Sequence, residues 1–100
     1  MLDYEFSPEA ELEVLAIERW WQAEGDDPSL FRRELEHAIT HLLEFPDAGS
    51  IYETKDSRRQ VRRILLPKSG QWVYYTVDRT RQLLRIHTLE GTLRERQPNL

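Results

Sequence analysis

Several basic residues, one tyrosine and one histidine in the C-terminal half have the types needed to hold and cleave a phosphodiester. They are Arg62, Arg63, Tyr74, Arg85 and His87, with Lys55 or Lys68 nearby. Arginine stabilises charge that develops on a phosphoryl group, and His87 or Tyr74 would move a proton. The same residues also fit a solvated basic face that docks an acidic protein segment. The sequence favours this second interpretation, because no general acid and base pair accompanies the arginines.

A second group, formed by Glu34, His37 and His41, lies on one predicted helix. The two histidines are spaced by one helical turn and could chelate a metal. The apolar stripe of this helix, which contains Phe31 and Leu35, points the other way and leaves the group on the solvent face. No glutamate directly follows the first histidine, as a zinc-protease motif requires. We therefore expect no metal site and no cofactor.

Aromatic residues form a third group, and their types would suit an open sheet that stacks on nucleic-acid bases. The group comprises Trp20, Trp21, Trp72, Tyr74 and Tyr75. We favour packing over base stacking, with Trp21 and Tyr75 in the core. Trp72 and Tyr74 would then line a groove for a partner. No glycine-rich phosphate loop, nucleophile elbow or clustered carboxylate pair accompanies them.

Three predicted strands in the C-terminal half must position the basic residues, Tyr74 and His87. Val61 to Leu66 and Trp72 to Val77 are rich in β-branched, aliphatic and aromatic residues, and residues 67–70 form a turn between them. A third strand, Leu83 to Leu89, follows a polar turn. Alternation in this last strand predicts two faces. One face carries Leu84, Ile86 and Thr88, and the other carries Leu83, Arg85, His87 and Leu89.

The N-terminal half predicts one short strand and two helices. Residues 2–6 alternate apolar and acidic side chains, which is typical of a half-buried strand. Ser7-Pro8 is a helix start signal, because serine caps the first turn and proline lacks the N–H that would be unpaired there. Asp27-Pro28 repeats this signal. We therefore expect helices at residues 8–23 and 28–45.

The order strand, helix, helix, strand, strand, strand predicts an α+β domain. We expect an antiparallel sheet with the helical hairpin packed on one face and the other face open. Residues 47–60 show no periodicity and are expected to contain no regular element. Residues 1–91 would form a single domain, and residues 92–100 a polar C-terminal tail.

The 100 residues include no cysteine, which excludes disulfides and thiolate chemistry. The net charge of −4 is unevenly distributed. Residues 1–54 hold 3 basic and 14 acidic residues, whereas residues 55–100 hold 11 basic and 4 acidic ones. The two halves would attract each other, or the basic half would meet an acidic partner. No apolar run is long enough to span a membrane, and the acidic N-terminus predicts no signal peptide, so we expect a cytoplasmic protein.

These pieces, in this order and spacing, resemble the RelE/ParE superfamily of toxins, and the ParE (plasmid-stabilisation) branch is the more similar one. The matching pieces are Ser7-Pro8-Glu9-Ala10, Ile17-Glu18-Arg19-Trp20-Trp21, Leu43-Glu44-Phe45-Pro46 with Gly49, Arg62-Arg63-Ile64-Leu65-Leu66-Pro67, Val73-Tyr74-Tyr75-Thr76-Val77-Asp78 and Leu84-Arg85-Ile86. One feature departs from the family. Leu89-Glu90-Gly91 stands where many members have an apolar residue, Trp-His and a basic run.

The resemblance implies the toxin of a bacterial type II toxin–antitoxin module that blocks DNA gyrase by binding, without chemistry of its own. It also implies an antitoxin that wraps the open sheet and the helical hairpin. A homodimer or a larger complex with antitoxin is compatible with such an apolar groove. The residues that we expect to meet a partner are Arg62, Arg63, Lys68, Trp72, Tyr74, Arg85, His87 and Leu89.

Two alternatives stay open. One is a RelE-like, ribosome-dependent mRNA endoribonuclease, whose catalytic residues would be Arg62, Arg63, Tyr74, Arg85 and His87. The other is an inactive family member that acts only as a binding protein. The acidic total charge and the absent Trp-His pair favour binding over cleavage.

Overall fold

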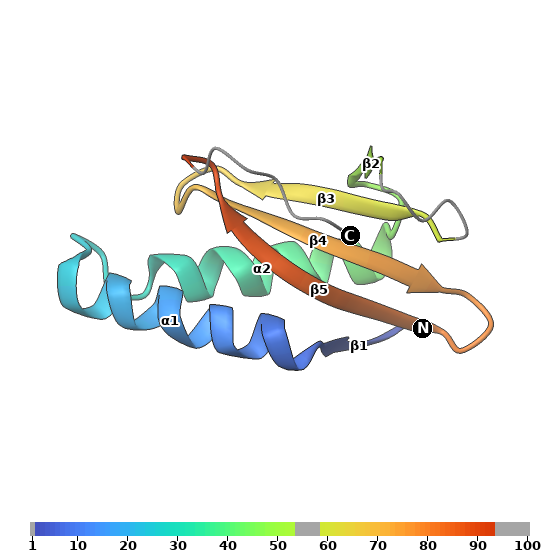
Figure 1. Cartoon of the computed structure of the whole chain (residues 1–100), viewed down its shortest axis with the longest axis horizontal. Helices are drawn as coiled ribbons and strands as arrows, with labels where there is room; N and C mark the ends of the chain where they lie inside the picture. The colour runs from blue at the N-terminus through green and yellow to red at the C-terminus, as the bar shows by residue number, and fades with distance from the viewer. Residues whose placement is uncertain (1, 54–58, 94–100) are drawn as a thin grey trace.

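The computed structural model describes residues 2–53 and 59–93. Two helices run side by side along a five-stranded sheet (Figure 1). The elements are β1 (Asp3–Phe6), α1 (Pro8–Glu24), α2 (Leu30–Glu44), β2 (Ser50–Tyr52), β3 (Val61–Leu66), β4 (Gln71–Asp78) and β5 (Leu83–Gly91). The predicted α+β class is confirmed. No helix in these residues is long and apolar enough to cross a bilayer.

The sheet has the strand order β1-β5-β4-β3-β2 and is mixed rather than wholly antiparallel. The strands β2, β3, β4 and β5 pair antiparallel in sequence order, but β1 pairs parallel with β5, with Asp3 opposite Leu83. A tight turn forces its two strands to run antiparallel, whereas β1 is separated from β5 by most of the chain. The direction of β1 is therefore set by the helix that follows it.

The predicted start of α1 is confirmed in detail. The Ser7 hydroxyl accepts a hydrogen bond from the Ala10 N–H at 3.0 Å and donates one to the His87 carbonyl at 2.7 Å. Pro8 occupies the first helical turn. This one serine therefore caps the helix and also ties it to β5.

A glutamate also ties α1 to β5. The Glu13 carboxylate accepts hydrogen bonds from the Thr88 hydroxyl at 2.7 Å and the Leu89 N–H at 3.1 Å. Burial raises the pKa of Glu13 above its usual value, although both hydrogen bonds oppose this shift.

The second helix begins two residues later than predicted, at Leu30. The Asp27 carboxylate does not cap it, because it accepts hydrogen bonds from the Ser29 hydroxyl at 3.3 Å and from the Arg33 guanidinium at 2.6 Å. Leu30 N–H donates instead to the Asp27 carbonyl. The helix ends at Glu44, as expected from the proline that follows two residues later.

The expectation that residues 47–60 contain no regular element is wrong. Ser50–Tyr52 forms β2 and pairs with β3, with Ser50 opposite Arg63 and Tyr52 opposite Val61. The strand is too short for its alternation to show in the sequence. Its position depends on the segment before it, where Pro46 and Gly49 form hydrogen bonds with the Tyr75 side chain of β4.

The helices cover one face of the sheet and enclose an apolar core with it. This core comprises Ala10, Phe31, Leu35, Ala38, Ile39, Leu42, Leu66, Val73, Tyr75, Leu84, Ile86 and Leu89. The prediction that Tyr75 lies in the core is confirmed, because its side chain is fully buried. Trp21 packs against the core but is only partly buried, at the margin rather than the centre.

The Tyr75 hydroxyl fixes the connection between α2 and β2. It donates to the Pro46 carbonyl at 2.8 Å and accepts from the Gly49 N–H at 2.9 Å. A Cβ on Gly49 would lie 2.5 Å from this oxygen, so the close approach requires glycine. The ring thus brings the segment before β2 against the sheet.

We predict that Tyr75→Phe destabilises the fold by about 1–3 kcal/mol, because it leaves the buried Gly49 N–H without an acceptor. The matched control is Tyr74→Phe. Within the described residues its hydroxyl accepts one long hydrogen bond, from Arg63 at 3.4 Å, so the loss should be smaller. Urea denaturation of the three proteins measures the difference. Equal losses would contradict the role assigned to the Tyr75 hydroxyl.

Candidate functional site

The sheet face opposite the helices is the candidate site. Because side chains alternate along a strand, the core positions Val73, Tyr75 and Val77 place their neighbours on this open face. The cross-strand register extends the face to β2, β3 and β5. Its side chains come from Tyr52, Arg63, Leu65, Trp72, Tyr74, Thr76, Arg85 and His87.

An arginine sandwiched by aromatic rings forms the centre of this face. The Arg63 guanidinium lies 4.1 Å from the centroid of the Trp72 ring and 5.5 Å from that of Tyr52. Tyr52 in turn meets Tyr74 edge to face, with ring centroids 4.8 Å apart. Such cation–π contacts orient the guanidinium and keep its charge available at the surface. The guanidinium and the aromatic rings therefore hold one another in place on the open face.

Tyr74 was expected to be accessible on this face, as a partner-binding or proton-transferring residue. The structure shows that it is not accessible. Its side chain is 1% exposed, and Tyr52 and Arg63 contact it. Tyr52 of β2 and Arg63 of β3 cover it, and β2 was not predicted from the sequence. The Tyr74 hydroxyl therefore serves as a hydrogen-bond acceptor for Arg63 within the open face.

His87 and Arg85 are engaged by neighbours on the same face. His87 Nε2 lies 2.7 Å from the Thr76 hydroxyl, and Arg85 forms an ion pair with Glu5 of β1 at 2.8 Å. Burial lowers the pKa of His87 to about 4, aided by the charges of Arg59 and Arg85 and opposed by Glu5. The imidazole is therefore neutral at pH 7 and is a weak base.

Two residues expected on the open face lie elsewhere. Leu89 is 3% exposed and belongs to the core, because a register shift in the β4–β5 pairing adds one residue to β5 and reverses the alternation. Arg62 shares its face with Tyr75, which it opposes across the strands. Adjacent residues of a strand point to opposite faces, so Arg62 and Arg63 cannot act on one ligand together.

Of the two lysines, Lys68 is exposed in the β3–β4 turn, and Lys55 lies outside the described residues. The Lys68 and Ser69 N–H groups donate to the Glu34 carboxylate at 2.8 and 2.9 Å. Glu34 therefore closes this turn and is not on a free solvent face as predicted. His37 and His41 are exposed, and the described ranges contain no cluster of three residues able to hold a metal.

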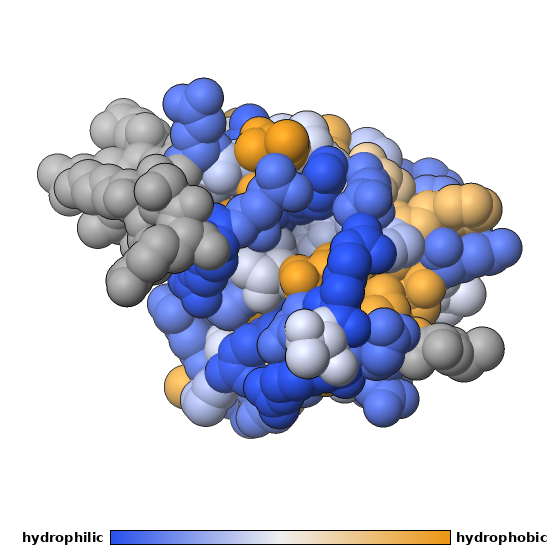
Figure 2. Space-filling view, turned by 90° about the vertical axis from the view of Figure 1, so that its right-hand side faces the viewer, coloured by the Kyte–Doolittle hydropathy of each residue, from blue (hydrophilic) through white to orange (hydrophobic). Residues whose placement is uncertain are grey.

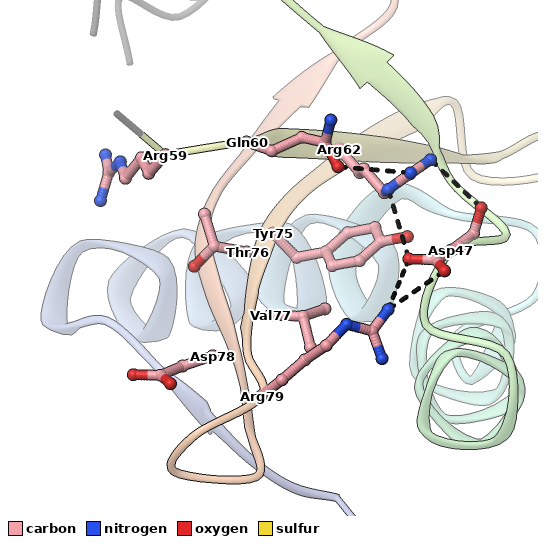
Figure 3. Close-up of a pocket in the computed structure, with 9 residues that line it drawn as sticks. All are labelled: Asp47, Arg59, Gln60, Arg62, Tyr75, Thr76, Val77, Asp78 and Arg79. Atoms are coloured by element: carbon pink, nitrogen blue, oxygen red, sulfur yellow. Dashed lines mark hydrogen bonds and ion pairs between the residues drawn. The ribbon is translucent and has the colours of Figure 1, made fainter. Parts of the chain in front are cut away.

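Apart from the open face, the structure has a hollow that the sequence did not indicate. It lies where β4 extends past the start of β3. It has a volume of about 500 Å³ (Figure 3). Asp47 bridges two arginines there, at 2.9 Å from Arg79 and 3.7 Å from Arg62. Arg62 also donates to the Gly49 carbonyl at 2.8 Å. Figure 2 shows this end of the molecule, where hydrophilic residues surround a hollow that contains residues of intermediate hydropathy.

The Asp47 cluster is best explained as a structural clamp. Its carboxylate already occupies both guanidinium groups, and the Arg62 side chain is only 20% exposed. These contacts fasten the loop before β2 to the end of the sheet. The participants are far apart in the sequence, so no spacing rule identifies them.

Comparisons with known proteins match the fold but not the sequence. No family model and no curated protein matches the chain. A crystal structure of the isolated E. coli RelE toxin is similar, with a TM-score of 0.65 and 20% identity over 95% of this chain and 88% of that one. The intact E. coli RelBE toxin–antitoxin complex gives a TM-score of 0.64 and 20% identity over 94% and 100% of the two chains. The chain therefore has a RelE-like fold.

The buried histidine predicts a pH-dependent stability. Because the pKa of His87 is lower in the folded state than in the unfolded chain, the unfolded state binds the proton first as the pH falls. Between pH 7.5 and pH 5 the protein should therefore lose about 2 kcal/mol of unfolding free energy through His87.

Denaturation of the parent protein and of His87→Gln at both pH values measures this loss. The variant should lose about 2 kcal/mol less than the parent over this range. His37→Gln, at an exposed histidine, is the matched control and should behave like the parent. Identical pH profiles for the parent and His87→Gln would contradict the assigned burial.

Proposed function

We propose that this protein is the toxin of a type II toxin–antitoxin pair and that it inhibits its target by binding. The observation that supports binding most directly is the Arg63 guanidinium held between Trp72 and Tyr52 on the open face. Aromatic residues and arginine dominate the energetics of protein interfaces. A fold similar to that of a known toxin supports the toxin assignment.

Binding is favoured over catalysis because the reactive side chains are poorly placed. His87 is neutral and half-buried against Thr76, and Arg85 is paired with Glu5. Tyr74 is buried. A ribonuclease needs an accessible acid and base with pKa values close to the working pH, and these residues do not supply the pair.

The proposal includes two protein partners. One is a cognate antitoxin, by analogy with the RelBE complex, in which the similar toxin is bound to its antitoxin. The other is the target, for which the ParE-like sequence pieces suggest DNA gyrase. Both partners would be cytoplasmic. The hetero-oligomer with antitoxin is the expected resting form.

A RelE-like endoribonuclease is the second candidate. It is favoured by one observation, namely that Arg63, Arg85 and His87 share the open face. Substrate binding would have to displace Glu5 from Arg85 before that guanidinium could contact a phosphate. This requirement makes cleavage the weaker candidate.

Paired assays on the antitoxin-free protein test the proposal. We expect inhibition of gyrase supercoiling, with mRNA left intact on programmed ribosomes. Trp72→Ala or Arg63→Ala should weaken the inhibition about tenfold or more, since each removes the contact between Arg63 and Trp72. Arg81→Ala changes an exposed arginine of the β4–β5 turn and should retain full inhibition.

Cleaved mRNA with normal supercoiling would replace the binding mechanism by the endoribonuclease. In that case Arg85→Ala and His87→Gln should abolish cleavage. Inactivity in both assays would contradict both candidates and leave the protein as a binding protein without toxicity.

A further inference from the structure

The outward side of α1 is unusually apolar for the surface of a protein with a charged exterior. Leu12 is 70% exposed, Leu15 47% and Trp20 55%. Leu12, Ala16 and Trp20 recur at i, i+4 and i+8, so they form one stripe along the helix. The core-facing stripe is separate and begins with the buried Ala10.

A hollow of about 420 Å³ adjoins this stripe where α1 passes the β3–β4 turn and the end of β5. Ile17, Trp20 and Trp21 of α1 line it. The two tryptophans meet edge to face, with ring centroids 5.3 Å apart. The stripe and the hollow together form a continuous apolar surface, which we name the α1 flank. Surfaces of this kind mark sites of protein association.

The charge around the α1 flank is strongly negative. Helix α1 carries five glutamates and one arginine. Glu18 is paired with Arg32, and Glu13 is bonded to β5. Glu9 and Glu24 make no hydrogen bond or ion pair with the part of the chain that the structure describes. Glu9 lies three residues before Leu12, on the same side of the helix.

We infer that the α1 flank binds a basic amphipathic helix of another protein, whose apolar side chains cover Leu12, Ala16 and Trp20 while its lysines or arginines face Glu9 and Glu24. The 17-residue helix α1 is roughly 25 Å long and matches a partner helix of similar length. The inference rests on the surface of α1 and does not depend on the proposed toxin function.

A second copy of this chain is a poorer occupant of the α1 flank. In a symmetric pair, each α1 would face the glutamates of the other, which like-charge repulsion disfavours. A basic helix removes the same apolar surface from water and adds attraction. Charge complementarity therefore selects a heterologous partner.

Synthetic peptides test the inference. The probe is a helix-forming peptide of about 16 residues with leucines on one face and lysines on the other. A matched peptide has glutamate in place of every lysine. Titration with full-length protein, followed by peptide anisotropy, should give saturable binding of the lysine peptide and at least about tenfold weaker binding of the glutamate peptide.

Three variants locate the peptide on the protein. Leu12→Ala with Trp20→Ala should weaken binding about tenfold or more. Glu9→Gln with Glu24→Gln should weaken it about threefold and reduce its dependence on salt. Ile51→Ala, at an equally exposed apolar side chain on β2, should leave binding unchanged.

Absent binding, or binding insensitive to both double variants, would overturn the inference. A loss on Ile51→Ala would equally overturn it by moving the site to β2. Sedimentation of the free protein supplies the remaining check. Self-association that Trp20→Ala abolishes would assign the α1 flank to a second copy of the chain.

Discussion

A one-residue register shift between β4 and β5 determines which side chains reach each face of the molecule. Tyr74 lies opposite Thr88, whereas Tyr75 lies opposite Ile86, so His87 is the extra residue of β5. A bulge of this kind lets a strand change the face of every later side chain. His87 thereby remains near Thr76 on the open face, and Leu89 enters the core. Without the shift, the end of β5 would expose a leucine and lose its packing on α1.

The open face therefore combines charged and aromatic groups that constrain one another. Arg63 is oriented by two rings, and Arg85 is neutralised by β1. His87 is kept uncharged by burial and by nearby arginines. Groups held in this way present a rigid surface, which suits recognition because little side-chain entropy remains to be lost on binding. The same constraints keep His87 neutral at pH 7 and bury Tyr74, the two residues that the sequence suggested for proton transfer.

The chain also separates charge between its two layers. The acidic residues lie mainly in the helical half and the basic ones in the sheet half, and the ion pairs between Asp47 and two arginines join the layers at one end. Most of the other charged residues that the structure describes are exposed. The molecule therefore offers two surfaces of opposite sign, a cationic and aromatic sheet face and an acidic, apolar helix flank.

The sequence by itself determined the α+β class, both helices and four of the five strands, because their apolar periodicities and start signals are local. It also placed Tyr75 in the core and Arg85 on the open face. Tertiary structure alone decided the bulge, the added strand β2 and the parallel pairing of β1. These depend on contacts between distant residues, such as the Tyr75 hydroxyl with the loop before β2. The alternation of apolar and polar residues describes one strand by itself, whereas the register shift belongs to the pairing of β4 with β5. The sequence pattern therefore could not predict that Leu89 would be buried.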